Sequence, residues 1–406
     1  MVLGSTTEPL RAELAAALPD RPFAVRFWDG STLPATNGGG GLTFSARSPR
    51  AVAHVLLAPG QLGLSRAYVS GELEVDDIDG VLALLRDWSP PPIDRATQRR
   101  LLLGAVRAAG IMRPPRPPAV ELRPRGRRHS LARDARAVRH HYDVADEFFA
   151  LFLDPSMTYS CAIFDNPSRD DEPLESAQER KLETICRKLA LTPGERVLDV
   201  GCGWGGFAIH AATRHGADVV GITLSEPQAA LARERAAAAG VGDLVEIRVA
   251  DYREMRGEQF DAIASIGMVE HVGDVQIDAY AATLADLLTT SGRLLNHGIA
   301  RLRPDEGEAG AFSERYVFPD AAPLHLSRVL LALERAGFVT EHVEGYAEHY
   351  ARTLSHWAAR LDAGAADGER LAGAERMRVW RLYLRAARSG FQTGFTSIYQ
   401  VRCRRA

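Results

Sequence analysis

The stretch from Arg196 to His215 constrains the fold of this chain more than any other part of its 406 residues. A short apolar run from Arg196 to Val200 leads into Gly201, Gly203 and Gly205, and a helical pattern follows directly. Glycine allows tight turns and close backbone approach to a ligand, and open α/β sheets bind small molecules where their parallel strands end. The pattern therefore predicts a strand-to-helix turn that holds a nucleotide-like ligand.

A glycine-rich turn alone is ambiguous, because dinucleotide-binding proteins share it and glycines also serve packing. Here the spacing is Gly-x-Gly-x-Gly, and Asp199 stands two residues before Gly201. This arrangement resembles the first motif of class I S-adenosylmethionine (SAM) methyltransferases, whose ligand carries a sulfonium and an amino acid but no pyrophosphate. We therefore expect Asp199, Gly201, Gly203 and Gly205 to bind SAM.

Strands and helices alternate along the chain after this turn. The expected strands cover 196–200, 219–224, 245–249, 260–266 and 293–297. Such alternation indicates parallel strands joined by crossover helices. The expected fold class is α/β, with a doubly wound, mostly parallel, Rossmann-like sheet of the class I SAM methyltransferase type, preceded by a small α+β amino-terminal domain.

The length suits two domains. Residues 1–90 read as a small α+β module that serves either lipid binding or dimerisation, so a homodimer is left open. Residues 91–129 are rich in proline and arginine and are expected to form a linker, because proline removes donors and favours extended backbone. Residues 130–406 are expected to form the SAM-dependent catalytic domain.

Charge is distributed unevenly. The formal net charge is −3, yet thirteen arginines lie between Arg95 and Arg139 against two acids, Glu121 and Asp134. On charge alone, this segment is either a solvated face or a surface that meets an anionic membrane. Its amphipathic part, between the prolines, could lie on lipid. We expect no nucleic acid partner.

Cysteine usage and hydropathy bear on the compartment. The 4 cysteines form neither CxxC pairs nor a disulfide framework, and we expect no metal site. Neither a signal peptide nor an apolar run long enough to span a bilayer is evident. The expected location is the cytoplasm, with peripheral association at the inner face of the membrane.

Several motifs in combination point to one family. They are His140-His141-Tyr142-Asp143-Val144, Met157-Thr158-Tyr159-Ser160-Cys161, Leu198 to Gly206, Thr223 to Gln228, Gly267 to Gly273, and Tyr350 to Leu354. Together they resemble the cyclopropane fatty acid synthase family, which includes the mycolic acid cyclopropane synthases. The resemblance covers roughly residues 130 to 402, and residues 1–90 more distantly resemble the amino-terminal lipid-binding domain of the longer bacterial members.

The resemblance implies SAM-dependent transfer of a one-carbon unit to the cis double bond of an unsaturated acyl chain of a phospholipid, forming a cyclopropane. In that family the alkene attacks the sulfonium methyl, a cation forms, and bound bicarbonate removes a proton to close the ring. Such chemistry needs a dry site with the methyl donor at near-attack distance, and aromatic faces that stabilise a cation.

The resemblance also assigns residues. The bicarbonate-holding positions are Cys161, Glu270, His297, the backbone of Ile299, and Tyr350, although each alone has an ordinary structural explanation. For SAM, it assigns Tyr142 to the methionine end, Gly201 and Gly203 to close backbone approach, Thr223 and Gln228 to the ribose, and Asp251 and Tyr252 to the adenine.

One position departs from the family, because Ala387 stands where many relatives carry a cysteine. This supports bicarbonate, rather than that thiol, as the base. The alternatives are a C-methyltransferase that forms a methylene-branched chain, a small-molecule methyltransferase, and a catalytically inactive lipid-binding protein.

Overall fold

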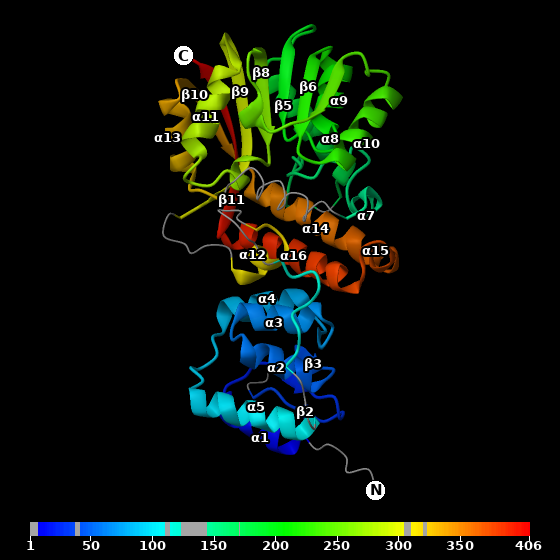
Figure 1. Ribbon diagram of the computed structural model, residues 1–406, viewed down its shortest axis with the longest axis vertical. Helices are drawn as coiled ribbons and strands as arrows, with labels where there is room; N and C mark the ends of the chain where they lie inside the picture. The colour runs from blue at the N-terminus through cyan, green and yellow to red at the C-terminus, as the bar shows by residue number, and fades with distance from the viewer. Residues whose placement is uncertain are drawn as a thin grey trace. The chain divides into compact units, whose positions relative to one another are not determined.

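The computed structural model describes residues 7–36, 41–109, 114–122, 144–169, 171–303, 310–319 and 323–406. Internal contacts divide the chain into two compact units. Unit 1 comprises Met1–Arg123, Gly310–Val317 and Gly373–Ala386, and unit 2 comprises Pro124–Ala309, Phe318–Ala372 and Ala387–Ala406 (Figure 1). Tyr142, expected at the methionine end of SAM, lies outside the described residues.

Unit 1 contains a four-stranded sheet in the order β2-β1-β3-β4. Its strands are β1 (Ala24–Arg26), β2 (Thr32–Leu33), β3 (Thr43–Ala46) and β4 (Leu73–Val75). Its helices include α1 (Glu8–Ala17), α2 (Pro49–Leu57), α3 (Gln61–Val69), α4 (Ile78–Asp87), α5 (Arg95–Ala109) and α12 (Ala311–Tyr316). Phe23 anchors the core, with its ring edge-on to Phe44 and Trp88. This is the mixed α+β module expected at the amino terminus.

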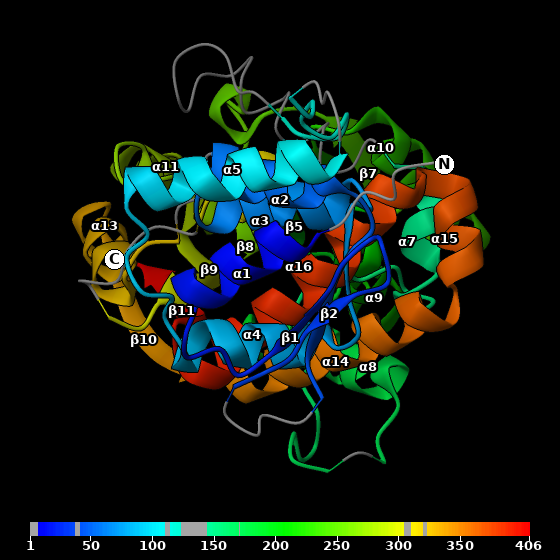
Figure 2. The ribbon, with the colours of Figure 1, turned by 90° about the horizontal axis from the view of Figure 1, so that it is seen from below.

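Helix α5 belongs to this unit, although the sequence placed it in a linker at 91–129. Leu101 and Ala105 on α5 are buried, and the helix packs alongside α1 and α2 (Figure 2). The flanking prolines therefore mark the ends of a packed helix and not the edge of a domain. Segments 310–317 and 373–386 also group with unit 1, so the compact units do not follow the contiguous division 1–90, 91–129 and 130–406.

Unit 2 is organised around a seven-stranded sheet in the order β10-β11-β9-β8-β5-β6-β7. The strands are β5 (Arg196–Val200), β6 (Asp218–Thr223), β7 (Val245–Val249), β8 (Phe260–Ile266), β9 (Leu288–Arg301), β10 (Phe338–Gly345) and β11 (Thr396–Arg405). Strands β5 to β9 pair in parallel, whereas β11 runs antiparallel to both β9 and β10. The predicted doubly wound, mostly parallel sheet is confirmed.

Helices cover both faces of this sheet (Figure 1). One face packs against α8 (Leu174–Lys188), α9 (Gly206–His215) and α10 (Glu226–Ala238), and the other against α11 (Ile277–Asp286) and α13 (Leu326–Arg335). Among the described residues, the other helices of unit 2 are α7 (Asp146–Ala150), α14 (Ala347–Ala363) and α15 (Ala365–Ala372), with short 3-10 turns η1 (Tyr252–Glu254) and η2 (Val269–His271). Helix α16 (Ala374–Thr393) is divided between the two units after Ala386. Within the described ranges, no helix combines the length and apolarity needed to cross a bilayer.

Candidate active site

A cavity of about 170 Å³ lies at the carboxyl ends of β5, β6, β7 and β8. Its wall includes the predicted cofactor residues Asp199, Gly201, Gly203, Thr223, Gln228, Asp251 and Tyr252. These residues come from three separate strand ends, which meet at one edge of a parallel sheet. Apart from Gly205, the structure brings every described cofactor candidate to this one cavity.

The three glycines of the β5–α9 turn share a positive φ angle but differ in their surroundings. Gly201, Gly203 and Gly205 have φ angles of 82°, 54° and 81°. A Cβ on Gly201 would lie 2.7 Å from Met268 Cγ, whereas a Cβ on Gly203 would meet nothing within 4 Å. Gly205 is absent from the cavity wall, its φ of 81° favours glycine, and an added Cβ there would lie 3.2 Å from Ala232 Cβ.

The cavity wall contains a buried acid, Asp199, and a buried base, Lys181, whose charges affect each other's pKa. Burial raises the pKa of Asp199 to about 7, and Lys181 partly opposes that shift. Burial also lowers the pKa of Lys181 to about 8, and its Nζ donates to Ser160 Oγ at 3.0 Å. Asp199 Oδ2 is buried without a hydrogen-bond partner among the described residues. An orphaned carboxylate oxygen beside an open glycine backbone fits the zwitterionic methionine end of SAM.

The wall beyond β6 is preorganised by side-chain hydrogen bonds. Thr223 Oγ1 donates to Gln228 Oε1 at 2.8 Å, which leaves the Gln228 amide nitrogen as a donor for a ribose hydroxyl. Ser225 Oγ caps α10 by accepting from Gln228 N at 3.4 Å. After β7, Asp251 accepts from Arg253 N at 2.9 Å and from Arg253 Nη2 at 2.6 Å, so its carboxylate is already paired. Tyr252 is buried edge-on to Tyr280.

Glu270 belongs to a second group of polar residues. It lies in η2, between Met268 and His271, which both line the cavity. Its Oε1 accepts from Ile299 N at 3.4 Å, while its Oε2 is buried with no hydrogen-bond partner among the described residues. Burial raises the pKa of Glu270 to about 7. The predicted pair Glu270 and Ile299 is thus brought into contact.

His297 is held by a chain of polar side chains across β9 and β11. It stands opposite Gln400 in the strand register, with Gln400 Nε2 3.3 Å from His297 Nδ1. Lys188 Nζ donates to Gln400 Oε1 at 2.7 Å. Because an ammonium can only donate, the Gln400 amide is oriented with its nitrogen toward the imidazole. His297 Nδ1 then accepts, and Nε2 carries the ring proton.

Burial also keeps this imidazole neutral, since it holds the pKa of His297 well below its usual range. His297 Nε2 is buried and makes no hydrogen bond to any described residue. The result is an oriented N–H donor without an acceptor.

Cys161 lies beside the amino-terminal cap of α14, and Tyr350 lies in the first turn of that helix. Cys161 Sγ lies 3.8 Å from the carbonyl oxygen of Tyr346, whose ring centre is 6.1 Å from that of His297. Tyr350 follows one turn later and packs its ring 4.7 Å from Phe391. Burial raises the pKa of the Cys161 thiol far above its usual range, so the thiol stays neutral.

Aromatic rings connect the cavity with Tyr350. Tyr159 lines the cavity and stacks on Trp357 at 5.1 Å, and Trp357 in turn lies edge-on to Tyr350 at 6.1 Å. Aromatic faces attract cations most strongly in desolvated surroundings. The Tyr159 ring, which is the one of these three that lines the cavity, can therefore stabilise positive charge there.

Sequence reasoning missed several of these residues. Tyr346, at the amino-terminal cap of α14, and Trp357 share the helix face of the predicted Tyr350, and this helical spacing was the available signal. Lys181, Lys188 and Gln400 carried no local signal, because each acts through residues far away in the sequence.

The strand order, the glycine turn after β5 and the acid at its end define a class I SAM-dependent methyltransferase. The chain belongs to the mycolic acid cyclopropane synthetase family, whose model matches residues 129–401.

Known proteins similar to this chain are both synthases and methyltransferases. A probable fatty acid methyltransferase of Mycobacterium tuberculosis is 38% identical over 400 residues, covering 96% of this chain and 92% of the relative. The cyclopropane-fatty-acyl-phospholipid synthase of Escherichia coli K12 is 32% identical over 347 residues, covering 85% and 84%. The crystal structure of mycolic acid cyclopropane synthase CmaA1 complexed with SAH and CTAB superposes with a TM-score of 0.63 at 33% identity, covering 67% of this chain and 98% of that one.

Proposed function

We propose that this enzyme transfers a one-carbon unit from SAM to the cis double bond of an unsaturated acyl chain of a phospholipid and closes a cyclopropane, with bicarbonate as the base. One observation carries the proposal: Glu270 Oε2 and His297 Nε2 are both buried and, among the described residues, both without partners. A buried polar atom without a partner costs about 1–3 kcal/mol. Two of them beside a methyltransferase cavity favour a small polar guest.

Bicarbonate suits this pair, because it combines a hydroxyl donor with acceptor oxygens. Glu270 would accept from the hydroxyl, while His297 Nε2, the Ile299 amide and the Tyr350 phenol would donate to the oxygens. Cys161 would close the site as a neutral thiol that is a weak nucleophile. When bound, bicarbonate would supply a base for the proton that ring closure releases.

The chain's own residues would prepare the transfer by position and by exclusion of water. When bound, SAM supplies an electrophilic methyl group. Gly201 and Gly203 would allow SAM to lie against the backbone of the glycine turn. Tyr159, which lines the cavity, would present its ring to the cationic acyl chain, with Trp357 stacked behind it and Tyr350 edge-on to Trp357. Ring faces contribute about 2 kcal/mol or more to a desolvated cation without supplying a competing nucleophile.

A second candidate product is a methylene-branched chain, because some relatives are named as fatty acid methyltransferases. Besides the mycobacterial relative above, a tuberculostearic acid methyltransferase of Mycobacterium tuberculosis is 31% identical over 393 residues. If a hydride shift precedes proton loss, the same residues would give a methylene-branched chain. The intact set of Glu270, His297 and Tyr350 supports ring closure, because a bicarbonate held by them would lie near the newly added methyl group, which loses a proton when the ring closes.

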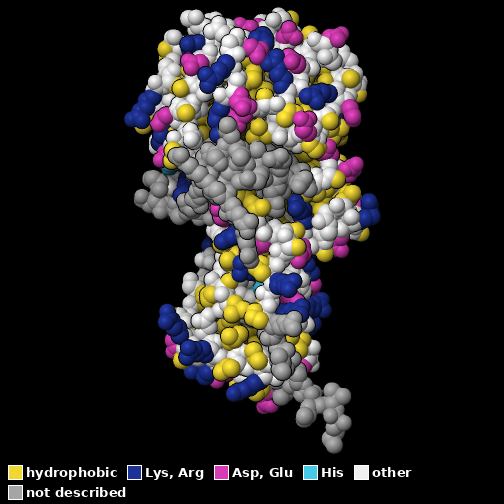
Figure 3. All heavy atoms as spheres, viewed as in Figure 1, with side chains coloured by type: hydrophobic (Ala, Val, Ile, Leu, Met, Phe, Trp, Pro, Cys, Tyr) yellow, Lys and Arg dark blue, Asp and Glu magenta, His cyan; other side chains and the backbone are white. Residues whose placement is uncertain are grey.

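An enzyme that acts on the acyl chain of a phospholipid must also contact a membrane. The proposed location is the cytoplasm, with peripheral association at the inner face of the membrane. Helix α5 buries Leu101 and Ala105, while Arg99, Leu103 and Arg107 are exposed four residues apart along one stripe. Leu103 is 52% exposed, and hydrophobic and basic side chains both occur on the face of unit 1 drawn in Figure 3. Such a stripe suits the interface of an anionic bilayer.

The test uses purified enzyme, methyl-labelled SAM and vesicles of cis-monounsaturated phospholipid, with and without bicarbonate in degassed buffer. Label should enter the lipid, bicarbonate should stimulate transfer, and Glu270→Gln should retain SAM affinity while turnover falls by about 10²-fold or more. Turnover that is independent of bicarbonate and unchanged in Glu270→Gln would reject the base assignment. Label absent from lipid despite SAM binding would favour the inactive lipid-binding alternative.

A further inference from the structure

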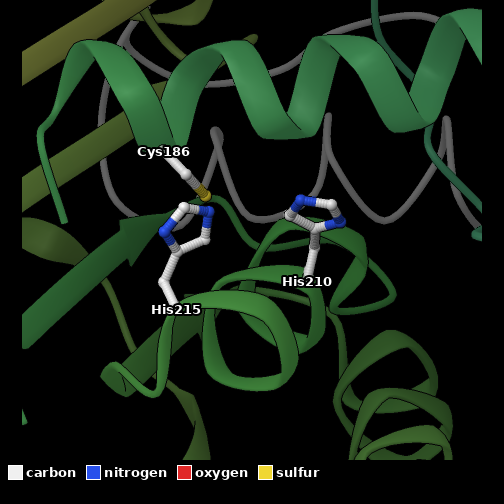
Figure 4. A group of neighbouring side chains, drawn as sticks. All are labelled: Cys186, His210 and His215. Atoms are coloured by element: carbon white, nitrogen blue, oxygen red, sulfur yellow. The ribbon is translucent and has the colours of Figure 1, made fainter. Parts of the chain in front are cut away.

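A group of metal-ligating side chains lies between α8 and α9, outside the active site. Cys186 on α8 and His210 and His215 on α9 each place one ligand atom within 4.8 Å of the others. Figure 4 shows both imidazoles extending from α9 toward the Cys186 thiol. Sequence analysis gave no hint of this group, because its members come from two helices and lack a recognised spacing.

Glu183, one turn before Cys186 on α8, contacts both histidines of this group. Its Oε2 lies 3.3 Å from His210 Nε2 and 3.0 Å from His215 Nε2. Its other oxygen, Oε1, lies 3.5 Å from Arg187 Nε, so the two carboxylate oxygens face different partners. Ligand atoms around a tetrahedral zinc ion lie about 3.3 Å apart when each metal–nitrogen or metal–oxygen bond is about 2.0 Å. The distances from Glu183 Oε2 to the two imidazole nitrogens are close to those edges, and the ligand atoms of Cys186, His210 and His215 lie within 4.8 Å of one another.

We propose that Cys186, His210 and His215, with Glu183 as the fourth ligand, bind a zinc-class divalent ion. Zinc prefers thiolate and imidazole ligands to a set made only of oxygen ligands. Charge also balances, because one thiolate and one carboxylate neutralise the two positive charges of the ion. On binding, the thiol releases its proton to solvent, and each imidazole keeps its ring proton on Nδ1.

The surroundings fit a structural ion rather than a catalytic one. The His210, His215 and Glu183 side chains are 10%, 19% and 35% exposed, so an ion can enter from solvent. Four protein ligands leave no open coordination position for a substrate. The ion would clamp α8, which carries Lys181 to the cavity wall, onto α9, which begins after the glycine turn.

The test measures metal content and affinity in the full-length protein. Purified wild-type chain, supplied with zinc and then dialysed, should hold one zinc per chain by mass spectrometry of the metal. Cobalt(II) in place of zinc should give the intense visible bands of a tetrahedral site and a thiolate-to-metal charge-transfer band. Each of Cys186→Ser and His215→Gln should weaken zinc binding by at least about 10-fold.

The matched controls are Cys403→Ser, a buried cysteine elsewhere, and His342→Gln, an exposed histidine. Both should bind zinc like the wild type. Because Cys186 is buried and its variant can misfold, His215→Gln at a partly exposed position is the deciding substitution. A wild-type chain that retains no zinc and takes up no cobalt, or a folded His215→Gln chain that binds zinc as tightly as wild type, would overturn the proposal.

Discussion

Gln400 Nε2 lies 3.3 Å from His297 Nδ1, across the β11–β9 pair, and this contact sets which imidazole nitrogen carries the proton. The Gln400 amide is itself oriented by Lys188, whose Nζ lies 2.7 Å from Gln400 Oε1. Two residues without contact to the proposed bicarbonate would therefore decide whether His297 presents a donor or an acceptor to it.

Replacing Gln400 tests this positioning role. In Gln400→Glu, the new carboxylate would accept from His297 Nδ1–H, leaving Nε2 as an acceptor that repels an anion. We expect turnover at neutral pH to fall by about 10²-fold with little change in SAM affinity. The carboxylate also stabilises the imidazolium, so activity should recover as pH falls and both ring nitrogens become donors.

The measurements are a pH–rate profile and the ¹⁵N chemical shifts of the histidine ring, which report the tautomer directly. Gln392→Glu, an equal change at an exposed position on α16, serves as the control. A Gln400→Glu enzyme with the wild-type pH profile and the Nε2–H tautomer would disprove the relay.

A second prediction concerns the glycine turn. Gly203 has a φ of 54°, and no atom lies within 4 Å of an added Cβ. In Gly203→Val, the new side chain would therefore occupy the cavity without striking a neighbouring residue, and the backbone would be strained. We expect SAM binding to be abolished. Gly194, with a φ of 79° and equally open surroundings away from the cavity, provides the matched control Gly194→Val. Calorimetric titration with SAM decides, and unchanged affinity in folded Gly203→Val protein would refute the assignment.

The sequence was most informative where function depends on consecutive residues. The strand from Arg196 to Val200 and its glycine turn were predicted with the bounds that the structure has. The role of Gly205 in SAM binding stays a prediction, since Gly205 is absent from the cavity wall and the contact of its position with Ala232 arises only in the folded chain. The local sequence does not distinguish a glycine whose missing side chain makes room for a ligand from one whose missing side chain makes room for a neighbouring helix.

Prediction was weaker where a residue acts through distant partners. Strands β10 and β11 were not expected, because they follow a stretch without clear periodicity, and their antiparallel pairing is set by the rest of the sheet. Gln400 therefore remained unnoticed. For α5, the arginines drew attention to the exposed stripe, while Leu101 and Ala105, which pack it into unit 1, received none.

The buried carboxylate of Glu270 should leave a mark on stability. Burial raises its pKa from 4.5 to about 7, so between these values the folded state binds more protons than the unfolded state. The free energy of unfolding must then decrease as pH rises through this range, by about 3 kcal/mol at most for this group.

Glu270→Gln removes this dependence. We expect ligand-free Glu270→Gln to lose less stability than wild type between pH 5 and pH 8, measured by denaturant unfolding at both values. Glu348→Gln, at an exposed position on α14, should behave like wild type. Parallel pH dependence in Glu270→Gln and wild type would show that the carboxylate is not buried in a dry site.

The exposed stripe of α5 predicts salt-sensitive binding to anionic vesicles. Reversing Arg99 and Arg107 to Glu should weaken binding, since each basic residue near such a surface contributes about 1 kcal/mol. The control reverses Arg169 and Arg370, whose side chains are 68% and 67% exposed in unit 2. Sedimentation with anionic and neutral liposomes at two salt concentrations measures the effect. Equal binding to both liposomes without a salt effect would leave the stripe as a solvated face.

The central claim concerns the product, and proton NMR of lipid from a host that is fed oleate and expresses this chain tests it most directly. Cyclopropane methylene protons resonate upfield of all ordinary lipid signals. We predict that this upfield pair appears with wild-type enzyme and is lost with Glu270→Gln, because Glu270 positions the base that closes the ring. Vinylidene resonances without the upfield pair would contradict ring closure and identify the methylene-branched product instead.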